Sequence, residues 1–203
     1  HCYFPESRVV KQEQGRARRY FPALIGESAE RLVVHYQVEL DAVERVAGYD
    51  CQVMWLRPRD RLRFAHRLCA ELKSGLLLKA AIANERGEQV EQVAFSTLSI
   101  GAPLSRDALR SAYVGEQHTW KTDASNWSAP ASAWQVKDVP PGFRKIMEMQ
   151  RRMPGQAGPV RQMVFSDGLA AFSVFIEPQN RTHPARGPRQ VGPVSVLTKH
   201  TDE

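Results

Sequence analysis

Repeated β-hairpin signals constrain the fold of this chain more than any other feature of its sequence. Two runs rich in β-forming residues, 51–56 and 62–68, flank a turn cluster at residues 57–60. The runs 76–84 and 90–100 repeat this arrangement. Short runs joined by turn residues are typical of hairpins, whereas parallel strands would need longer, mostly helical crossovers. The sequence therefore predicts an antiparallel meander, either flat or curled into a part-open barrel.

The run 62–68 also predicts how the sheet buries its side chains. Leu62, Phe64 and Leu68 alternate with Arg63 and Arg67. This alternation is typical of an antiparallel strand with one face on the core and the other in water. We therefore expect the three apolar side chains to point inward, and the arginines of this hairpin to form a solvated face.

Helical signals are few. Residues 23–31 are compatible with a short helix, and residues 105–110 with the start of another. Residues 32–38 are rich in valine and predict a strand. The longest apolar run, at residues 74–83, is well short of the ~18–20 residues of a membrane span. The fold class predicted from these signals is β-rich α+β.

A change of composition divides the chain into two domains. Residues 121–133 are rich in Ser, Ala, Asn, Asp and Pro and have little apolar periodicity, which is typical of a linker. We predict a large domain over residues 1–113, a linker over residues 114–133 and a small β-rich domain over residues 134–203.

Turn residues and aromatic side chains organise the small domain. Turns are predicted at residues 140–143 and 166–168, where Pro and Gly favour tight reversals, and a Pro/Gly/Arg-rich loop at residues 178–193. Strands are expected on either side of these segments. The aromatic residues of the domain are expected to form its core rather than a binding platform: Trp134, Phe143, Phe165, Phe172 and Phe175.

The small domain is the most basic part of the chain. The sequence has 28 Lys and Arg against 22 Asp and Glu, a net charge of +6, and residues 134–203 hold 10 of these basic and 6 of these acidic side chains. Such a surplus favours an acidic partner, but it is too sparse for a dedicated nucleic-acid binder. We expect partner-binding residues with few acids beside them: Arg144, Lys145, Arg151, Arg152 and Arg161.

No catalytic or metal-binding motif points to an enzyme. The sequence has no Gly-x-Ser-x-Gly elbow, no phosphate-binding glycine loop and no His-Glu-x-x-His. Its six histidines are scattered, and none has the spacing of a co-ligand. We therefore expect a binding protein without a cofactor or a metal site.

The cysteines allow one disulfide. Cys2, Cys51 and Cys69 are too few for a disulfide scaffold, and none is in a CxxC pair. A hairpin whose turn centres near Asp60 places Cys51 and Cys69 almost opposite each other, within reach of a bond if both side chains share a face. The strand register decides this point, because Cys69 points away from the face of its neighbour Leu68.

Several ordered motifs resemble the RseB/MucB family. The large-domain motifs are residues 44–53, 58–64, 72–79 and 85–92. Beyond the linker, Trp134-Gln135-Val136 followed by Val139-Pro140-Pro141-Gly142-Phe143 is similar to the start of that family's small domain. Residues 165–177 resemble its most recognisable run. Because these motifs occur in order at compatible spacings over nearly the whole chain, the match is far more specific than a lone motif.

This resemblance implies a function and a location. The family consists of periplasmic regulators of the envelope-stress sigma factor, which bind the periplasmic segment of a transmembrane anti-sigma factor and shield it from regulated proteolysis. Lipid A-type or lipoprotein-like signals are thought to relieve this protection. The resemblance further implies a LolA-like, part-open barrel around an apolar cavity that could hold an acyl ligand, with a small domain that supplies much of the partner contact.

The function and the oligomeric state stay open at this level. The alternative function is a periplasmic lipid or lipoprotein carrier of the LolA type, which would co-purify with lipid and need no protein partner. Nucleic-acid binding would rest on charge alone and is not expected, and a homo-oligomer is left open. The motifs start inside the large domain and stop before the family's last strand and helix, so we expect the chain to be truncated at both ends.

Overall fold

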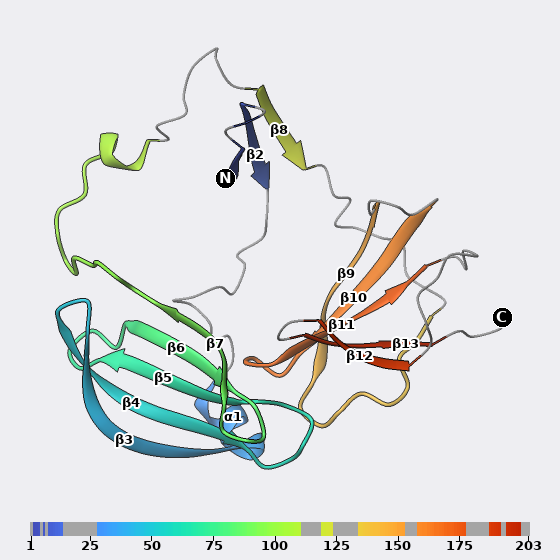
Figure 1. Cartoon of the computed structure of the whole chain (residues 1–203), viewed down its shortest axis with the longest axis horizontal. Coiled ribbons are helices and arrows are strands. Elements are labelled where there is room, and N and C mark those ends of the chain that lie inside the picture. Colours follow the sequence, from blue (N-terminus) through green and yellow to red (C-terminus); the bar gives the residue numbers. More distant parts are fainter. Residues whose placement is uncertain are drawn as a thin grey trace.

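The predicted hairpins form one five-stranded antiparallel sheet (Figure 1). In the computed structural model, the residues described are 2–4, 6, 8–13, 28–110, 119–123, 134–152, 158–177, 187–191 and 194–199. The strands of this sheet pair in chain order: β3 (Tyr36–Val46), β4 (Tyr49–Pro58), β5 (Ala65–Glu71), β6 (Leu77–Ala83) and β7 (Gln89–Ala94). The predicted meander is therefore confirmed.

The sheet is open within the described part of the chain. There, β3 pairs only with β4, and β7 pairs only with β6. A closed barrel is thus not formed by these strands, and the part-open LolA-like barrel is not confirmed. The tight connection between β3 and β4 uses Ala47 and Gly48, both with positive φ, as a two-residue hairpin turn requires.

One predicted strand begins later than expected. Residues 32–38 were expected to be extended, but α1 spans Ala29–His35 and β3 starts only at Tyr36. The Ser28 carbonyl accepts the first helical hydrogen bonds, and the helix opens on residues of good helix propensity. The Val33-Val34 pair favoured the strand prediction, although a helix of seven residues tolerates β-branched residues. No helix of the described residues is long and apolar enough to cross a bilayer.

Both faces of the large sheet bury apolar side chains, so the expected division into one dry and one wet face is wrong. One face carries a cluster that includes Tyr36, Leu56 and Leu68, and the opposite face carries a cluster around Val53 and the two cysteines of β4 and β5. Leu62 was expected to point inward, but it lies in the loop before β5 and is 61% exposed.

The small domain contains a three-stranded sheet and a separate hairpin. The sheet has the order β11-β10-β9, with β9 at Arg144–Arg152, β10 at Pro159–Ser166 and β11 at Ala171–Ile176. The hairpin pairs β12 (Gly187–Val191) with β13 (Val194–Thr198), so β12 lies within the segment predicted as a loop.

The aromatic core of the small domain is confirmed in part. The rings of Phe143 and Phe165 lie 5.3 and 4.9 Å from that of Phe172, measured between ring centroids. Phe165 is buried, but Trp134 and Phe175 are exposed by 43% and 45%.

Another three-stranded sheet contains a strand from the predicted linker. β2 (Val9–Glu13) pairs with β1 (Cys2–Phe4) and, in parallel, with β8 (Thr119–Asp123). A 3₁₀ turn at Asp107–Leu109 lies within the segment where a helix start was predicted.

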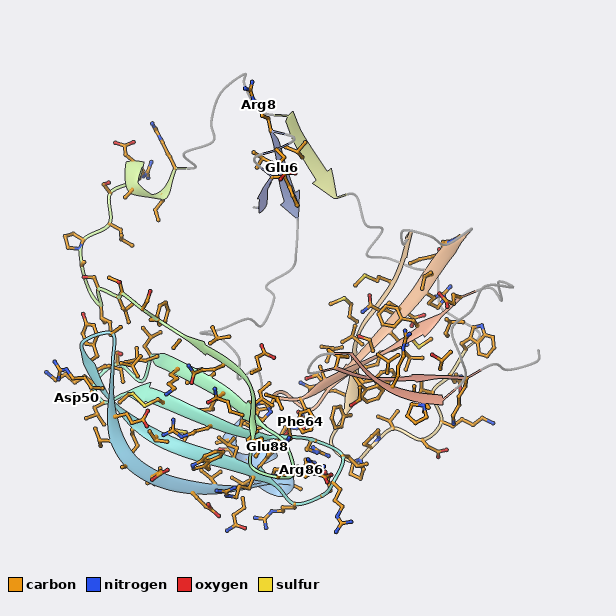
Figure 2. All side chains as sticks on the ribbon, in the orientation of Figure 1. Glu6, Arg8, Asp50, Phe64, Arg86 and Glu88 are labelled. Atoms are coloured by element: carbon orange, nitrogen blue, oxygen red, sulfur yellow. A yellow bond between two sulfur atoms is a disulfide. The ribbon has the colours of Figure 1, made fainter. Side chains whose placement is uncertain are left out.

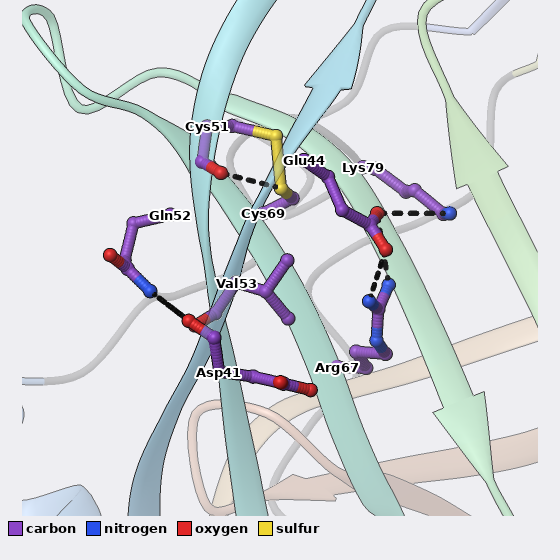
Figure 3. Close-up of a disulfide and its surroundings, with 8 residues drawn as sticks. All are labelled: Asp41, Glu44, Cys51, Gln52, Val53, Arg67, Cys69 and Lys79. Atoms are coloured by element: carbon purple, nitrogen blue, oxygen red, sulfur yellow. Dashed lines mark hydrogen bonds and ion pairs between the residues drawn. A yellow bond between two sulfur atoms is a disulfide. The ribbon is translucent and has the colours of Figure 1, made fainter.

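The predicted disulfide is present (Figure 3). Cys51 on β4 and Cys69 on β5 are bonded, with their Cα atoms 5.3 Å apart. The register pairs Val53 with Cys69, so the two cysteines are diagonal neighbours on one face rather than directly opposite. Both are at most 1% exposed.

Removing this bond should lower the stability of the large domain. A disulfide that closes a loop of about 18 residues is worth about 3 kcal/mol, mainly through the unfolded state. We expect the C51A/C69A double variant to lose roughly that much free energy of unfolding, measured by urea denaturation. The matched control is Cys2→Ser, which leaves the pair intact. An unchanged midpoint in the double variant would contradict a stabilising role.

Candidate functional site

The predicted basic residues lie on two adjacent strands of the small domain. Arg144, Lys145, Arg151 and Arg152 belong to β9, and Arg161 belongs to β10, opposite Gln150 of β9. The side chains of Arg151 and Arg152 lie outside the described part of the structure. The strand pairing thus brings the backbone positions of the whole set together, as a partner-binding cluster requires.

An acid within this cluster changes its charge. Glu148 accepts hydrogen bonds from Lys145 Nζ and Arg161 Nη1, each at 2.7 Å. The Lys145 hydrogen bond lowers the pKa of Glu148 most, burial opposes the shift, and Arg161 lowers the pKa further. We expected few acids beside the cluster, yet Glu148 sits between two of its members. Arg144 is exposed on the same strand.

A second group of polar side chains joins the two domains, and its centre is Arg63. The Arg63 side chain is fully buried in the loop between β4 and β5. Its Nε and Nη2 donate to the Asp60 carboxylate at 3.2 and 2.9 Å, and its Nη1 donates to Asp167 Oδ2 at 2.6 Å. Nη2 also donates to the Pro141 carbonyl at 2.8 Å. One guanidinium therefore contacts two separate turns of the small domain.

Asp167 stabilises its own turn and also accepts hydrogen bonds from the large domain. Its Oδ1 accepts the backbone N–H groups of Leu169 and Ala170 at 2.9 and 2.8 Å. Its Oδ2 accepts the Tyr36 hydroxyl at 2.8 Å in addition to Arg63. Aspartate suits this position because such local side-chain hydrogen bonds stabilise tight turns. With its carboxylate 1% exposed, both oxygens are used within the protein.

The turn at residues 140–143 supplies the other contact of the small domain. The Phe143 N–H bonds the Pro140 carbonyl at 3.1 Å, and Gly142 adopts φ +83°, so Pro141 and Gly142 occupy the central positions that favour a type II turn. A Cβ at Gly142 would overlap the His35 ring. The Phe143 ring lies 4.8 Å from the Arg63 guanidinium, within range of a cation–π contact.

Tyr36 and His66 line the large-domain side of this junction. Burial and the neighbouring Asp167 charge raise the pKa of Tyr36, so its hydroxyl stays protonated and donates. His66 is 6% exposed, and burial lowers the pKa of its ring. Leu169 of the small domain packs against the same apolar cluster. Figure 2 shows Phe64, the residue after Arg63, at the sheet end near the small domain, and Asp50 at the far end.

We define this group as the junction cluster: Tyr36, Asp60, Arg63, Pro141, Gly142, Phe143, Asp167 and Leu169. Sequence analysis missed it, because Arg63 was expected on a solvated face. A signal was present, since three of the motifs that resemble the RseB/MucB family each contain members of the cluster. The hydrogen bonds of this cluster connect the sheet of the large domain with two turns of the small domain. No three described His, Cys, Asp or Glu side chains gather as metal ligands would.

Comparison with known families gives two matches along the chain. Residues 1–113 match the family model described as the MucB/RseB N-terminal domain. Residues 128–203 match the model described as the MucB/RseB C-terminal domain. The junction cluster contains residues from both matched segments.

Curated relatives agree with these matches. The chain is 33% identical over 169 residues to the sigma factor AlgU regulatory protein MucB of Pseudomonas aeruginosa, covering 83% of this chain and 52% of that protein. It is 26% identical over 175 residues to the sigma-E factor regulatory protein RseB of Escherichia coli (strain K12), covering 81% and 50%. The chain thus spans about half the length of the curated relatives it matches.

Solved structures share the fold. The crystal structure of MucB in complex with MucA(peri) matches with a TM-score of 0.70 and 31% identity, covering 87% of this chain and 60% of that one. The crystal structure of MucB alone matches with a TM-score of 0.57 and 31% identity, covering 82% and 52%.

Breaking the junction cluster should lower the free energy of unfolding far more than breaking an exposed ion pair does. Asp167→Asn keeps the size of the side chain but removes the charge that faces buried Arg63, and such losses cost about 3–5 kcal/mol. The control is Asp50→Asn, whose partner Arg45 is 68% exposed, so we expect a loss of ~0–1 kcal/mol. Urea unfolding measures both. Equal losses of unfolding free energy in the two variants would contradict a larger contribution of the buried ion pair to stability.

Gly142→Ala tests the close approach of the two domains. Any residue with a Cβ is strained at positive φ by about 1–2 kcal/mol, and here the methyl group must also displace His35. Overpacking of this kind adds about 1–3 kcal/mol. The control is Gly87→Ala, which has a similar φ of +77° but open space around it. We expect the Gly142 variant to lose clearly more stability, and a loss equal to that of the control would contradict the contact.

Proposed function

The chain belongs to the MucB/RseB family, and on this premise we propose that it regulates an envelope-stress sigma factor from the periplasm. In this proposal it binds the periplasmic segment of a membrane anti-sigma factor and shields that segment from regulated proteolysis. The observation that carries the proposal is the likeness to MucB in complex with MucA(peri), which extends over 87% of this chain and includes both domains. The buried Cys51–Cys69 bond is consistent with an oxidising compartment.

The junction cluster supports a mechanism by occlusion rather than catalysis. Partners that bind a protein already held in its bound arrangement lose less free energy to ordering. Arg63 and Asp167 fix the two domains relative to each other by directional hydrogen bonds. One extended partner segment could then contact both domains at once and be covered along its length. No residue needs to act as a nucleophile or a general base in this mechanism.

The basic residues of β9 and β10 are proposed to attract the partner. Lys145 and Arg161 share the single carboxylate of Glu148, so the five basic residues of these two strands together still carry a surplus of positive charge. Exposed charges raise the association rate more than the final affinity. We test Arg144, Arg151 and Arg152 as the steering charges, because reversing these three leaves the ion pairs of Lys145 and Arg161 with Glu148 in place.

Reversing the steering charges should weaken capture of an acidic partner segment. We expect Arg144, Arg151 and Arg152 changed together to Glu to reduce affinity for MucA(peri) by roughly ten- to a hundredfold, because ~0.7 kcal/mol each sums to ~2 kcal/mol. The loss should lie mainly in the association rate, measured by surface plasmon resonance. It should shrink with salt, since the Debye length falls from ~10 Å at 0.1 M to ~3 Å at 1 M.

A charge-matched control separates local from global effects. Arg61, Arg86 and Arg106 are exposed residues of the large domain, and changing all three to Glu alters the net charge equally. This control should bind nearly as well as the parent protein. Both variants must keep the melting temperature of the parent. Normal capture by the β9 variant at low salt would show that these arginines are not part of the surface that binds the partner.

An exposed apolar strip supports a second candidate, a lipid or lipoprotein carrier of the LolA type. Val38 and Leu40 lie on the same face of β3 as Tyr36 and are 45% and 73% exposed. Their cross-strand partners Leu56 and Met54 extend this apolar face. Apolar surface of this kind suits an acyl chain. Mass spectrometry of the purified protein decides between the candidates, because a carrier retains lipid without a protein partner whereas a regulator captures MucA(peri).

A further inference from the structure

His66 is a buried imidazole without a hydrogen-bond partner among the described residues. It lies on β5 between Leu56 of β4 and Ile82 of β6, which pair with it across the sheet and offer only apolar side chains. Its ring meets the Tyr36 ring edge-on, with the centroids 6.2 Å apart. Because buried polar groups are normally hydrogen-bonded, a buried histidine without a partner invites an explanation.

The charged groups around His66 all belong to the junction cluster or border it. Tyr36 from β3 lies against the ring, and Asp167 from the β10–β11 turn is the carboxylate that acts on its charge. The Asp167 Oδ2 atom is already shared by the Tyr36 hydroxyl and Arg63. The Asp60 carboxylate already accepts hydrogen bonds from Arg63, and the charge of His35 on α1 also lowers the pKa of Asp60. A proton on His66 would therefore add a second buried cation near Arg63 without a free acceptor.

We propose that His66 is a pH-sensitive latch of the junction between the two domains: the neutral ring lets the junction close, and protonation opens it. Opening exposes His66 to water, where the imidazolium is solvated, and separates the Asp167 turn from Arg63. The consequence for partner capture rests on the function proposed above, because release would follow only if both domains hold the partner. The opening itself does not depend on that function.

The direction of the pH effect follows from the burial of the ring. Burial lowers the pKa of His66 below its usual 6.5, and Asp167 offsets only part of this shift. The closed junction is therefore fully favoured above pH 6.5, and this advantage is lost as the pH falls from 6.5 towards the lowered value. Burial acts to raise the pKa of Asp60, but hydrogen bonds from Leu62 N–H and Arg63 outweigh it, so Asp60 stays charged in this window.

Energy transfer between one dye on each domain tests the latch in the full chain. Arg86→Cys and Ser173→Cys, both at exposed positions, carry the dyes in a Cys2→Ser background. We expect the opening equilibrium constant to rise from pH 8 to pH 5.5 by up to about tenfold, the limit for one imidazole with an ordinary pKa near 6.5 in the open form. Energy transfer should change with the same midpoint as the His66 ring signal in NMR. A flat transfer signal, or midpoints that differ, would overturn the proposal.

Variants identify the residue responsible. His66→Gln and His66→Leu cannot titrate and should abolish the pH response, the first with a polar and the second with an apolar replacement. His35→Gln is the matched control, because His35 also borders the junction through Gly142 but is not the proposed latch. Loss of the response in the His35 variant, or its survival in either folded His66 variant, would reject His66 as the latch.

Binding measurements separate this proposal from the proposed function. MucA(peri) is the probe, and capture is measured at pH 7.5 and pH 5.5 beside energy transfer. Absence of capture at pH 7.5 together with a pH-dependent transfer signal would contradict the function and leave the latch standing. Capture at pH 7.5 with an unchanging transfer signal would contradict the latch and leave the function standing.

Discussion

The ion pair between Arg63 and Asp167 is the interaction on which the relation of the two domains depends. Burying two charges is costly unless every polar atom finds a partner. Here Asp60, Asp167 and the Pro141 carbonyl accept hydrogen bonds from the Arg63 guanidinium. The Tyr36 hydroxyl and two backbone N–H groups donate the other hydrogen bonds to the Asp167 carboxylate. Because these bonds are directional and come from separate segments, they favour one arrangement of the domains rather than simply adding stability.

Features set by neighbouring residues were predictable from the sequence. The hairpins of the large sheet, the turns at residues 140–143 and 166–168, and the Cys51–Cys69 bond all depend on residues close in the chain. The disulfide depended on register, and the structure places both sulfur atoms on one face. The error at residues 32–38 is of a different kind, because a seven-residue helix carries too little periodicity to outweigh two adjacent valines.

The junction cluster was not predictable in the same way. Arg63 is separated by 104 residues from Asp167, and Tyr36 by 131, so no local pattern links them. Alternation of arginine with leucine normally indicates a wet face, yet the small domain covers this end of the large sheet. Leu169 packs there against the apolar cluster that contains Tyr36 and Leu68. Because another domain buries these residues, the alternation does not indicate a wet face here. In the sequence, only the ordered motifs that resemble the RseB/MucB family contained members of the junction cluster.

In the proposed function, the two groups of charged residues act at different stages of partner binding. Arg144 and Lys145 on β9 are exposed, and charge at an exposed position acts at long range and is screened by salt. The Arg63 side chain is fully buried, so salt screens its ion pair with Asp167 much less. In this proposal, the exposed charges govern how often a partner arrives, and the junction cluster governs whether the two domains are arranged to bind it together. We therefore expect loss of the exposed charges to slow association and loss of the junction cluster to speed dissociation, because a partner held by one domain alone leaves sooner.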